Sequence, residues 1–169
     1  FVIVTNRPSI VEDAVRELRR SWRRTRIGVE IVETDNSNAV HTLFGQCTFQ
    51  RHLFPSLLNG YDKVLYVDTD TVFLNSPLQL WRHFGSMNAS QMIGIAPDLP
   101  DLRLRSYYVH ARWPKPTAAG LNSGLLLMNL KRMRQGGYER LIASVLRHMR
   151  PYFGIEDQDA LVVLFGLLP

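Results

Sequence analysis

The sequence is poor in cysteine, in lysine and in long apolar runs, and the first and last of these shortages each exclude a class of protein. Cys47 is the only cysteine among 169 residues, so neither an intrachain disulfide nor a metal site built from several cysteines is possible. No stretch is apolar over the length that a membrane-spanning helix needs, and no signal peptide is recognisable. Lysine supplies only 3 of the 20 basic residues, so arginine accounts for most of the positive charge.

The arginines are densest in the run RELRRSWRRTR, residues 16–26, and the net charge is +5. Such a run is compatible with nucleic-acid binding, but no aromatic residues interleave with it in a binding motif. Apolar residues recur at helical spacing through the same region: Ile10, Val11, Ala14, Val15, Leu18 and Trp22. We therefore interpret it as an amphipathic helix with a solvated basic face, and we expect no nucleic-acid partner.

The hydrophobic content of 46% is enough for one globular domain with a sizeable core. Strand patterns occur at Phe1–Thr5, Val29–Glu33, Lys63–Val67, Met92–Ala96 and Gly124–Leu130. Helix patterns begin at Ser9, which opens a capping box, and continue at Cys47–Leu58, Pro77–Phe84, Tyr138–Met149 and Asp157–Phe165. Pro55 predicts a break or a late start within the second helix. The alternation predicts an α/β fold with a mainly parallel sheet.

The segment KVLYVDTDTVFLNSPLQLW, residues 63–81, places two carboxylates where a buried strand ends. Side chains two residues apart in an extended chain project to the same side, so we expect Asp68 and Asp70 to point into one space. Two neighbouring carboxylates repel each other unless a positive charge lies between them. The pair therefore predicts a site for Mg²⁺ or Mn²⁺, although one aspartate capping a turn beside a solvated one is the simpler alternative.

Two enzyme classes share this signature. Phosphatases of the haloacid-dehalogenase type have a similar string, in which the first aspartate is a nucleophile and the second a general acid and base. Their motif usually ends the first strand of the domain, whereas two strand patterns and two helix patterns precede Asp68 here. Nucleotide-sugar glycosyltransferases have a D-x-D in the middle of the domain.

Three further stretches favour the second class: CTFQRHLFPSLL (47–58), GLNSGLLLMNLKRMR (120–134) and EDQDALVVLF (156–165). In this order and spacing the chain resembles glycosyltransferase family 8, which has the GT-A Rossmann-like fold. The segments YVDTD, LNSGLLLMNLKRMR and DQD are most similar to those of the animal glucoside xylosyltransferases. The resemblance covers roughly residues 40–165 and implies that residues 1–169 are part of a catalytic domain.

The resemblance also implies roles for individual residues. Asp68 and Asp70 match the family's metal and UDP site, and Arg51 matches a basic residue that contacts the donor. Asn122 and Ser123 match a turn beside the donor sugar, and Asp157 and Gln158 match a pair facing the anomeric centre; Asp98 matches a position near the acceptor. The alternatives are that Arg51 is a surface residue, that residues 122–124 are only a turn before a strand, and that Asp157 is only a helix cap.

The implied reaction is transfer of a sugar, most simply xylose from UDP-xylose, with retention and with Mn²⁺ or Mg²⁺ as cofactor. The implied acceptor is O-linked glucose on EGF-like repeats of the Notch type. The implied location is the Golgi or endoplasmic reticulum lumen, as a type II membrane protein anchored outside this chain; the sequon at Asn88 is compatible with it. The family's first strand and the histidine that provides its third metal ligand are not found in this sequence. A binding module without turnover therefore stays a second alternative beside the phosphatase.

Overall fold

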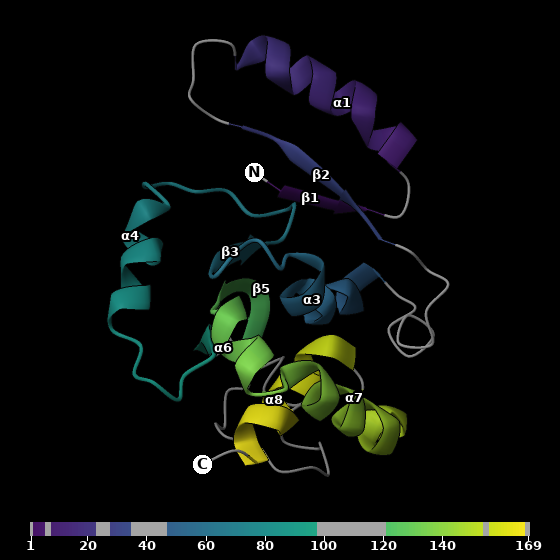
Figure 1. Ribbon diagram of the computed structural model, residues 1–169, viewed down its shortest axis with the longest axis vertical. Coiled ribbons are helices and arrows are strands. Elements are labelled where there is room, and N and C mark those ends of the chain that lie inside the picture. The colour runs from purple at the N-terminus through teal and green to yellow at the C-terminus, as the bar shows by residue number, and fades with distance from the viewer. Residues whose placement is uncertain are drawn as a thin grey trace. The chain divides into compact units, whose positions relative to one another are not determined.

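The computed structural model describes residues 2–5, 8–22, 28–34, 47–97, 121–153 and 156–167, and the chain divides into two compact units, 1–45 and 46–169 (Figure 1). The first unit is a strand–helix–strand motif of β1 (Val2–Thr5), α1 (Pro8–Ser21) and β2 (Glu30–Glu33). The two strands pair in parallel, with Val2 opposite Glu30 and Thr5 opposite Glu33. Both predicted strands of this unit are confirmed, and their parallel pairing agrees with the mainly parallel sheet that the sequence predicts.

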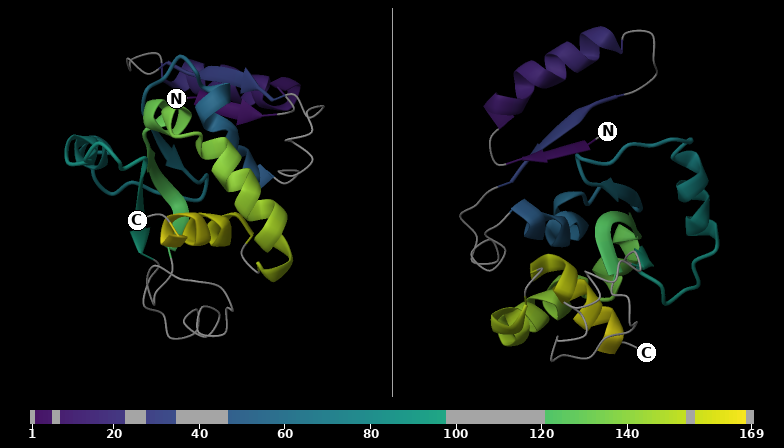
Figure 2. Two further views of the ribbon diagram at one scale, coloured as in Figure 1. Left: turned by 60° about the horizontal axis from the view of Figure 1, so that its bottom comes forward. Right: turned by 180° about the vertical axis from the view of Figure 1, so that it is seen from behind.

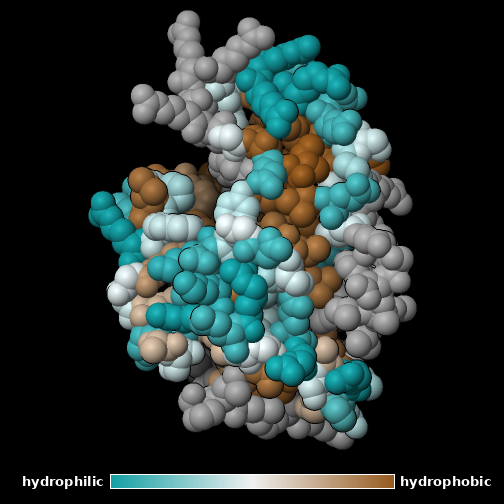
Figure 3. All heavy atoms as spheres, viewed as in Figure 1, coloured by the Kyte–Doolittle hydropathy of each residue, from teal (hydrophilic) through white to brown (hydrophobic). Residues whose placement is uncertain are grey.

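Helix α1 has the amphipathic pattern that its sequence predicts. Val15 is buried, whereas the arginine side of the helix is exposed and forms the hydrophilic outer layer of the first unit in Figure 3. Arg16 pairs with Asp13 at 3.0 Å, one turn away on the same helix. The helix begins at Pro8 rather than after Ser9, because proline's fixed φ suits the first helical position. The expected capping role of Ser9 is therefore wrong, since Ser9 lies inside the first turn.

The second unit contains the remaining elements. They are the 3₁₀ helix η1 (Cys47–Leu53), α3 (Phe54–Leu57), β3 (Val64–Val67), α4 (Leu78–Arg82), η2 (His83–Gly85), β4 (Ile93–Pro97), β5 (Leu121–Met128), α6 (Leu130–Gln135), α7 (Tyr138–Met149), η3 (Arg150–Tyr152) and α8 (Glu156–Leu167). The break predicted at Pro55 is confirmed: 3₁₀ geometry lasts to Leu53, and proline occupies the first turn of α3. Helix α6 is an addition to the predicted elements, and the Asn129 side chain caps it by accepting from the Arg132 N–H.

Strand β5 lies between β3 and β4 in a three-stranded sheet and runs antiparallel to both. Its two neighbours therefore share one direction, and β5 is the exception to the parallel arrangement that the sequence predicts. The register with β4 is irregular, because Ile95 pairs with Leu126 whereas Ala96 pairs with Asn122. Residues 123–125 of β5 lie between these two pairs and have no partner in β4.

The apolar core of the second unit forms where α6, α7 and α8 pack together with β5 (Figures 1 and 2). Met128, Leu130, Met133, Ile142 and Leu161 are fully buried there. The opposite side of β5 is less covered: Leu125 and Leu127 line a groove with Leu80 and His83 of the α4–η2 segment. Within the described residues, no helix combines the length and the apolar character needed to cross a membrane.

Candidate functional site

The D-x-D sequence begins where β3 ends. The Asp68 N–H donates to the Gly124 carbonyl at 2.9 Å, which continues the β3–β5 ladder by one residue. The chain then turns, because the Thr71 N–H donates to the Asp68 carbonyl at 3.1 Å. Residues 68–70 are thus a turn and not an extended strand, so the alternation argument for Asp68 and Asp70 does not apply to them. A cation site shared by Asp68 and Asp70 would therefore depend on the geometry of this turn and not on the alternation of a strand.

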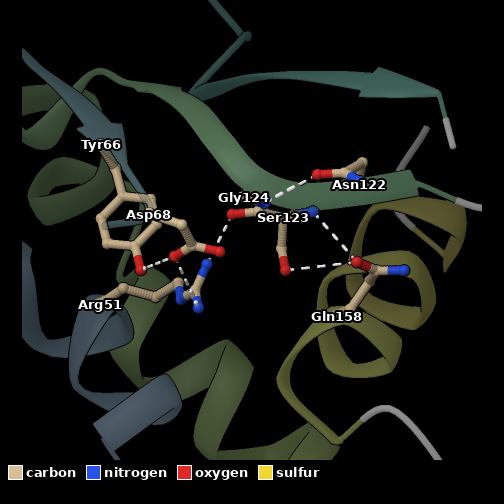
Figure 4. Close-up of polar contacts among 7 residues, drawn as sticks. All are labelled: Arg51, Tyr66, Asp68, Asn122, Ser123, Gly124 and Gln158. Carbon is tan, nitrogen blue, oxygen red and sulfur yellow. Dashed lines mark hydrogen bonds and ion pairs between the residues drawn. The ribbon is translucent and has the colours of Figure 1, made fainter. Parts of the chain in front are cut away.

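Asp68 and Asp70 differ in their surroundings. Asp70 is exposed in the turn, whereas the Asp68 side chain is 37% exposed and is held by two neighbours. The Tyr66 hydroxyl donates to Asp68 Oδ1, and Arg51 Nη2 lies 3.6 Å from the same oxygen (Figure 4). The first aspartate is therefore oriented by the protein, and the second lies open to solvent.

Arg51 is the buried positive charge of this site. It belongs to η1, its side chain is only 5% exposed, and its Nη1 donates to the Ser123 carbonyl at 2.5 Å. Its guanidinium carbon lies 4.3 Å from the centre of the Tyr66 ring, in the geometry of a cation–π contact. A buried guanidinium needs such compensation, and the Asp68 carboxylate, the carbonyl and the ring provide it. The surface-residue alternative for Arg51 is thereby wrong.

Asn122 and Ser123 lie within β5, not in a turn before it, so the boundary predicted for this strand was too late. The Asn122 side chain is exposed and accepts from the Gly124 N–H at 2.9 Å, whereas Ser123 is buried. Gly124 leaves little space beside it, because a Cβ there would lie 3.1 Å from both Asp68 Oδ2 and Asn122 Oδ1. The absence of a partner in β4 leaves the backbone of Ser123 available to Arg51 and to α8.

Gln158 approaches Ser123 from α8, on the other side from Arg51 (Figure 4). Its Oε1 accepts from the Ser123 N–H at 3.1 Å and from the Ser123 hydroxyl at 3.4 Å, and the residue is 8% exposed. Because the backbone N–H requires an acceptor, the orientation of the amide is fixed. Asp157 lies in the first turn of α8, but its side chain is outside what the structure describes, as is Asp98 altogether.

A neutral histidine lies next to the site. His52 is fully buried beside Arg51, and its Nδ1 is 2.8 Å from the Tyr138 hydroxyl. Burial, and secondly the Arg51 charge, lower the pKa of His52 from 6.5 to about 3. His52 is therefore uncharged at neutral pH, so of these two neighbouring buried residues Arg51 carries the positive charge.

The structure thus brings Arg51, Asp68, Ser123 and Gln158 together, and the exposed residues Asp70 and Asn122 follow and precede this group along the chain, two positions after Asp68 and one before Ser123. The carboxylates of Asp68 and Asp70 are hard oxygen donors of the kind that suits Mg²⁺ or Mn²⁺. Within the part of the chain that the structure describes, no group of three or more potential ligands forms a complete metal site. Tyr66 was missed by the sequence prediction, although its position two residues before Asp68, with the strand pattern at 63–67, was the available signal.

Comparisons with known proteins agree on one family. The model of glycosyl transferase family 8 matches residues 7–167. Glucoside xylosyltransferase 1 of Homo sapiens is 34% identical over 143 residues, which are 78% of this chain and 32% of that protein. Glucoside xylosyltransferase 2 of Mus musculus is 31% identical over 138 residues, covering 75% of this chain and 31% of that protein. The chain spans about a third of the length of the curated relatives it matches.

Solved glycosyltransferases have a similar fold. Mouse xyloside xylosyltransferase 1 matches with a TM-score of 0.59 at 19% identity, covering 98% of this chain and 67% of that one. The galactosyltransferase LgtC, solved in complex with donor and acceptor sugar analogues, matches with a TM-score of 0.63 at 19% identity, covering 98% and 70%. These likenesses show the GT-A fold that the sequence predicted.

Proposed function

Because the chain belongs to glycosyl transferase family 8, we propose that residues 1–169 are part of a catalytic domain that transfers a sugar from a UDP-sugar to a hydroxyl acceptor. The observation that carries this proposal is the meeting of Arg51, Asp68 and Gln158 around the backbone of Ser123. These side chains come from three separate elements, and they meet where β3 ends, which is where open α/β sheets place ligands. The family membership favours this function over the phosphatase alternative.

Asp68 and Asp70 are proposed to hold a divalent cation, Mn²⁺ or Mg²⁺. When bound, the cation neutralises the charge that develops on the diphosphate as it departs. Arg51 adds a buried positive charge behind Asp68 and limits the repulsion between the two carboxylates. Asn122 lies exposed on the same stretch of β5 and is proposed to contact the donor sugar together with Ser123.

The proposed transfer breaks the bond between the anomeric carbon and the UDP oxygen and forms a bond from that carbon to the acceptor oxygen. Attack on the face that UDP leaves retains the configuration, and the acceptor proton passes to the departing phosphate oxygen. Gln158 is proposed to orient the sugar, since Ser123 fixes its amide, and Asp157 to assist from the same helix turn. A double displacement needs a carboxylate nucleophile, and it is the less favoured route.

Xylose is the proposed sugar, and a glucoside on EGF-like repeats of a glycoprotein is the proposed acceptor. The support is the identity of 31–35% to proteins named glucoside xylosyltransferase. A Golgi or endoplasmic reticulum location with a type II anchor elsewhere in the protein belongs to the same proposal.

Calorimetric titration of UDP into the full-length protein, with and without Mn²⁺, tests this function. We expect binding that requires Mn²⁺ and that Asp70→Asn weakens by about 100-fold, since a ligand to the cation is lost. Asp62→Asn is the matched control: it makes the same charge change at a carboxylate that is 67% exposed and pairs with Lys131 and Arg134. UDP-xylose turnover then tests the sugar and separates an enzyme from a module that only binds. No UDP binding, together with phosphatase activity in Mg²⁺, would contradict the proposal.

A further inference from the structure

Tyr66 has no role in the function proposed above, yet it makes the hydrogen bond that orients Asp68. The residue lies in β3, and Asp68 two positions later still continues the β3–β5 ladder through its N–H, so the two side chains project to the same side. Figure 4 shows the ring alongside the carboxylate, with the hydroxyl directed at Oδ1. The contact therefore follows from the strand itself and needs no special turn.

Two side chains contact the Tyr66 ring. The Arg51 guanidinium lies over it at 4.3 Å, and the ring of Phe54 contacts it at a centroid distance of 5.9 Å with a tilt of 54°. Both contacts use the ring and not the hydroxyl. The direction of the hydroxyl is thus fixed before any ligand arrives, which is the property a positioning group needs.

The two oxygens of Asp68 are treated differently. Oδ1 receives the Tyr66 hydroxyl and faces Arg51 Nη2, but at 3.6 Å the arginine is too far for a hydrogen bond. Arg51 instead directs Nη1 at the Ser123 carbonyl. Arg51 therefore places a positive charge near the Asp68 carboxylate, whereas the Tyr66 hydroxyl fixes the orientation of that carboxylate. Oδ2 lies close to Gly124, where only the lack of a side chain allows the approach, because a Cβ there would come within 3.1 Å of this oxygen.

We propose that Tyr66 is a positioning residue that fixes the Asp68 carboxylate through Oδ1 and so presents Oδ2 to the divalent cation. This inference rests on the proposed function and deepens it, because it assigns one Asp68 oxygen to the protein and the other to the cation. Arg51 then acts on the donor through Asp68 and Ser123.

The variant Tyr66→Phe tests the hydroxyl alone, because phenylalanine keeps the ring that Arg51 and Phe54 contact. Mn²⁺ affinity is measured on the full-length protein from the electron paramagnetic resonance signal of free Mn²⁺, and unfolding by urea is followed in parallel. We expect the Mn²⁺ dissociation constant to rise about 10-fold, the usual loss when a partner of a ligating carboxylate is removed. Tyr152→Phe makes the same chemical change at a side chain of an exposed residue and should leave the Mn²⁺ affinity unchanged.

A second variant separates positioning from packing. Tyr66→Leu removes the ring as well, so a purely structural role predicts that Mn²⁺ affinity falls in Tyr66→Leu but not in Tyr66→Phe. That result, or an unchanged affinity in both variants, overturns the inference while leaving the proposed function intact. Wild-type protein that binds no Mn²⁺ and shows no Mn²⁺-dependent UDP binding overturns both. A 10-fold loss in Tyr66→Phe with an unchanged urea midpoint supports the inference.

Discussion

The two ends of β5 are built on different principles. Around Ser123 the strand is held by directed polar contacts: the Arg51 guanidinium on its carbonyl and the Gln158 amide on its N–H. Around Met128 it is held by apolar packing, and this side chain is fully buried. Directed bonds fix a geometry, whereas burial mainly provides free energy. One strand thus gives the site its precision at one end and anchors it in the core at the other.

Removal of apolar volume at the core end should give the largest effect on folding. Met128 is fully buried in the core, so Met128→Ala leaves a cavity there. We expect the free energy of unfolding to fall by about 2–5 kcal/mol. Urea denaturation measures this loss. UDP affinity of the folded fraction should stay within about twofold, since no site residue is changed. A large loss of affinity at unchanged stability would contradict the division between the two ends.

Acid should selectively weaken the polar end, through His52. The unfolded chain takes up the histidine proton near pH 6.5, whereas the folded protein has a His52 pKa of about 3. The contribution of the neutral His52 to the folding free energy is therefore fully present above pH 6.5 and is lost progressively as the pH falls from 6.5 towards 3. Between pH 7 and pH 5 the loss should be about 2 kcal/mol.

The variant His52→Gln isolates this contribution. The free energy of unfolding in urea is measured against pH for both proteins, and the titration of all other groups cancels in the difference between the two curves. The stability advantage of wild type should shrink from pH 7 to pH 5. His148→Gln removes an exposed histidine and serves as the matched control. Parallel curves for wild type and His52→Gln would contradict the prediction, because they would mean that His52 takes up its proton equally in the folded and the unfolded chain.

Adding one methyl group beside Asp68 tests whether the Ser123 end of β5 depends on a fixed geometry. The expected effect on the free energy of unfolding is smaller than for the changes above. Gly124→Ala places a Cβ 3.1 Å from Asp68 Oδ2, so the partly exposed carboxylate must move by a few tenths of an ångström. We expect the Mn²⁺-dependent affinity for UDP to fall about 10-fold, with a change in unfolding free energy below about 1 kcal/mol. Gly85→Ala is the matched control, because no atom lies within 4 Å of its added Cβ. Equal UDP affinity in the two variants would contradict the prediction.

Much of the fold was predictable, because local patterns decide it. Helix α7 has the predicted bounds Tyr138–Met149, and Pro55 marks the change from η1 to α3. The start of β5 was predicted too late, because Asn, Ser and Gly are turn residues by local preference. Here long-range partners keep them in the strand. The antiparallel direction of β5 likewise depends on tertiary pairing that no local pattern contains.

The sequence named Arg51, Asp68, Ser123 and Gln158, which the structure brings together, but it named neither Tyr66 nor the contacts among these residues. The D-x-D residues were found from the strand pattern before them and Gln158 from the resemblance to a family, whereas the burial of Arg51 is contrary to the ordinary preference of arginine for the surface. The turn at Asp70 overrides the alternation that was expected to align the two aspartates. The same alternation holds two residues earlier, where Asp68 still continues the β3–β5 ladder, and there it pairs Tyr66 with Asp68.

The distances along the chain between the partners of Ser123 have a consequence for how the protein is made. Arg51 precedes Ser123 by 72 residues and Gln158 follows it by 35. No short peptide contains a precursor of this arrangement, so its formation must wait for large loops to close. Synthesis proceeds from the N-terminus, and α8 is the last described element to emerge. A nascent chain that ends before α8 thus has its aspartates and its arginine but lacks the amide that completes the site.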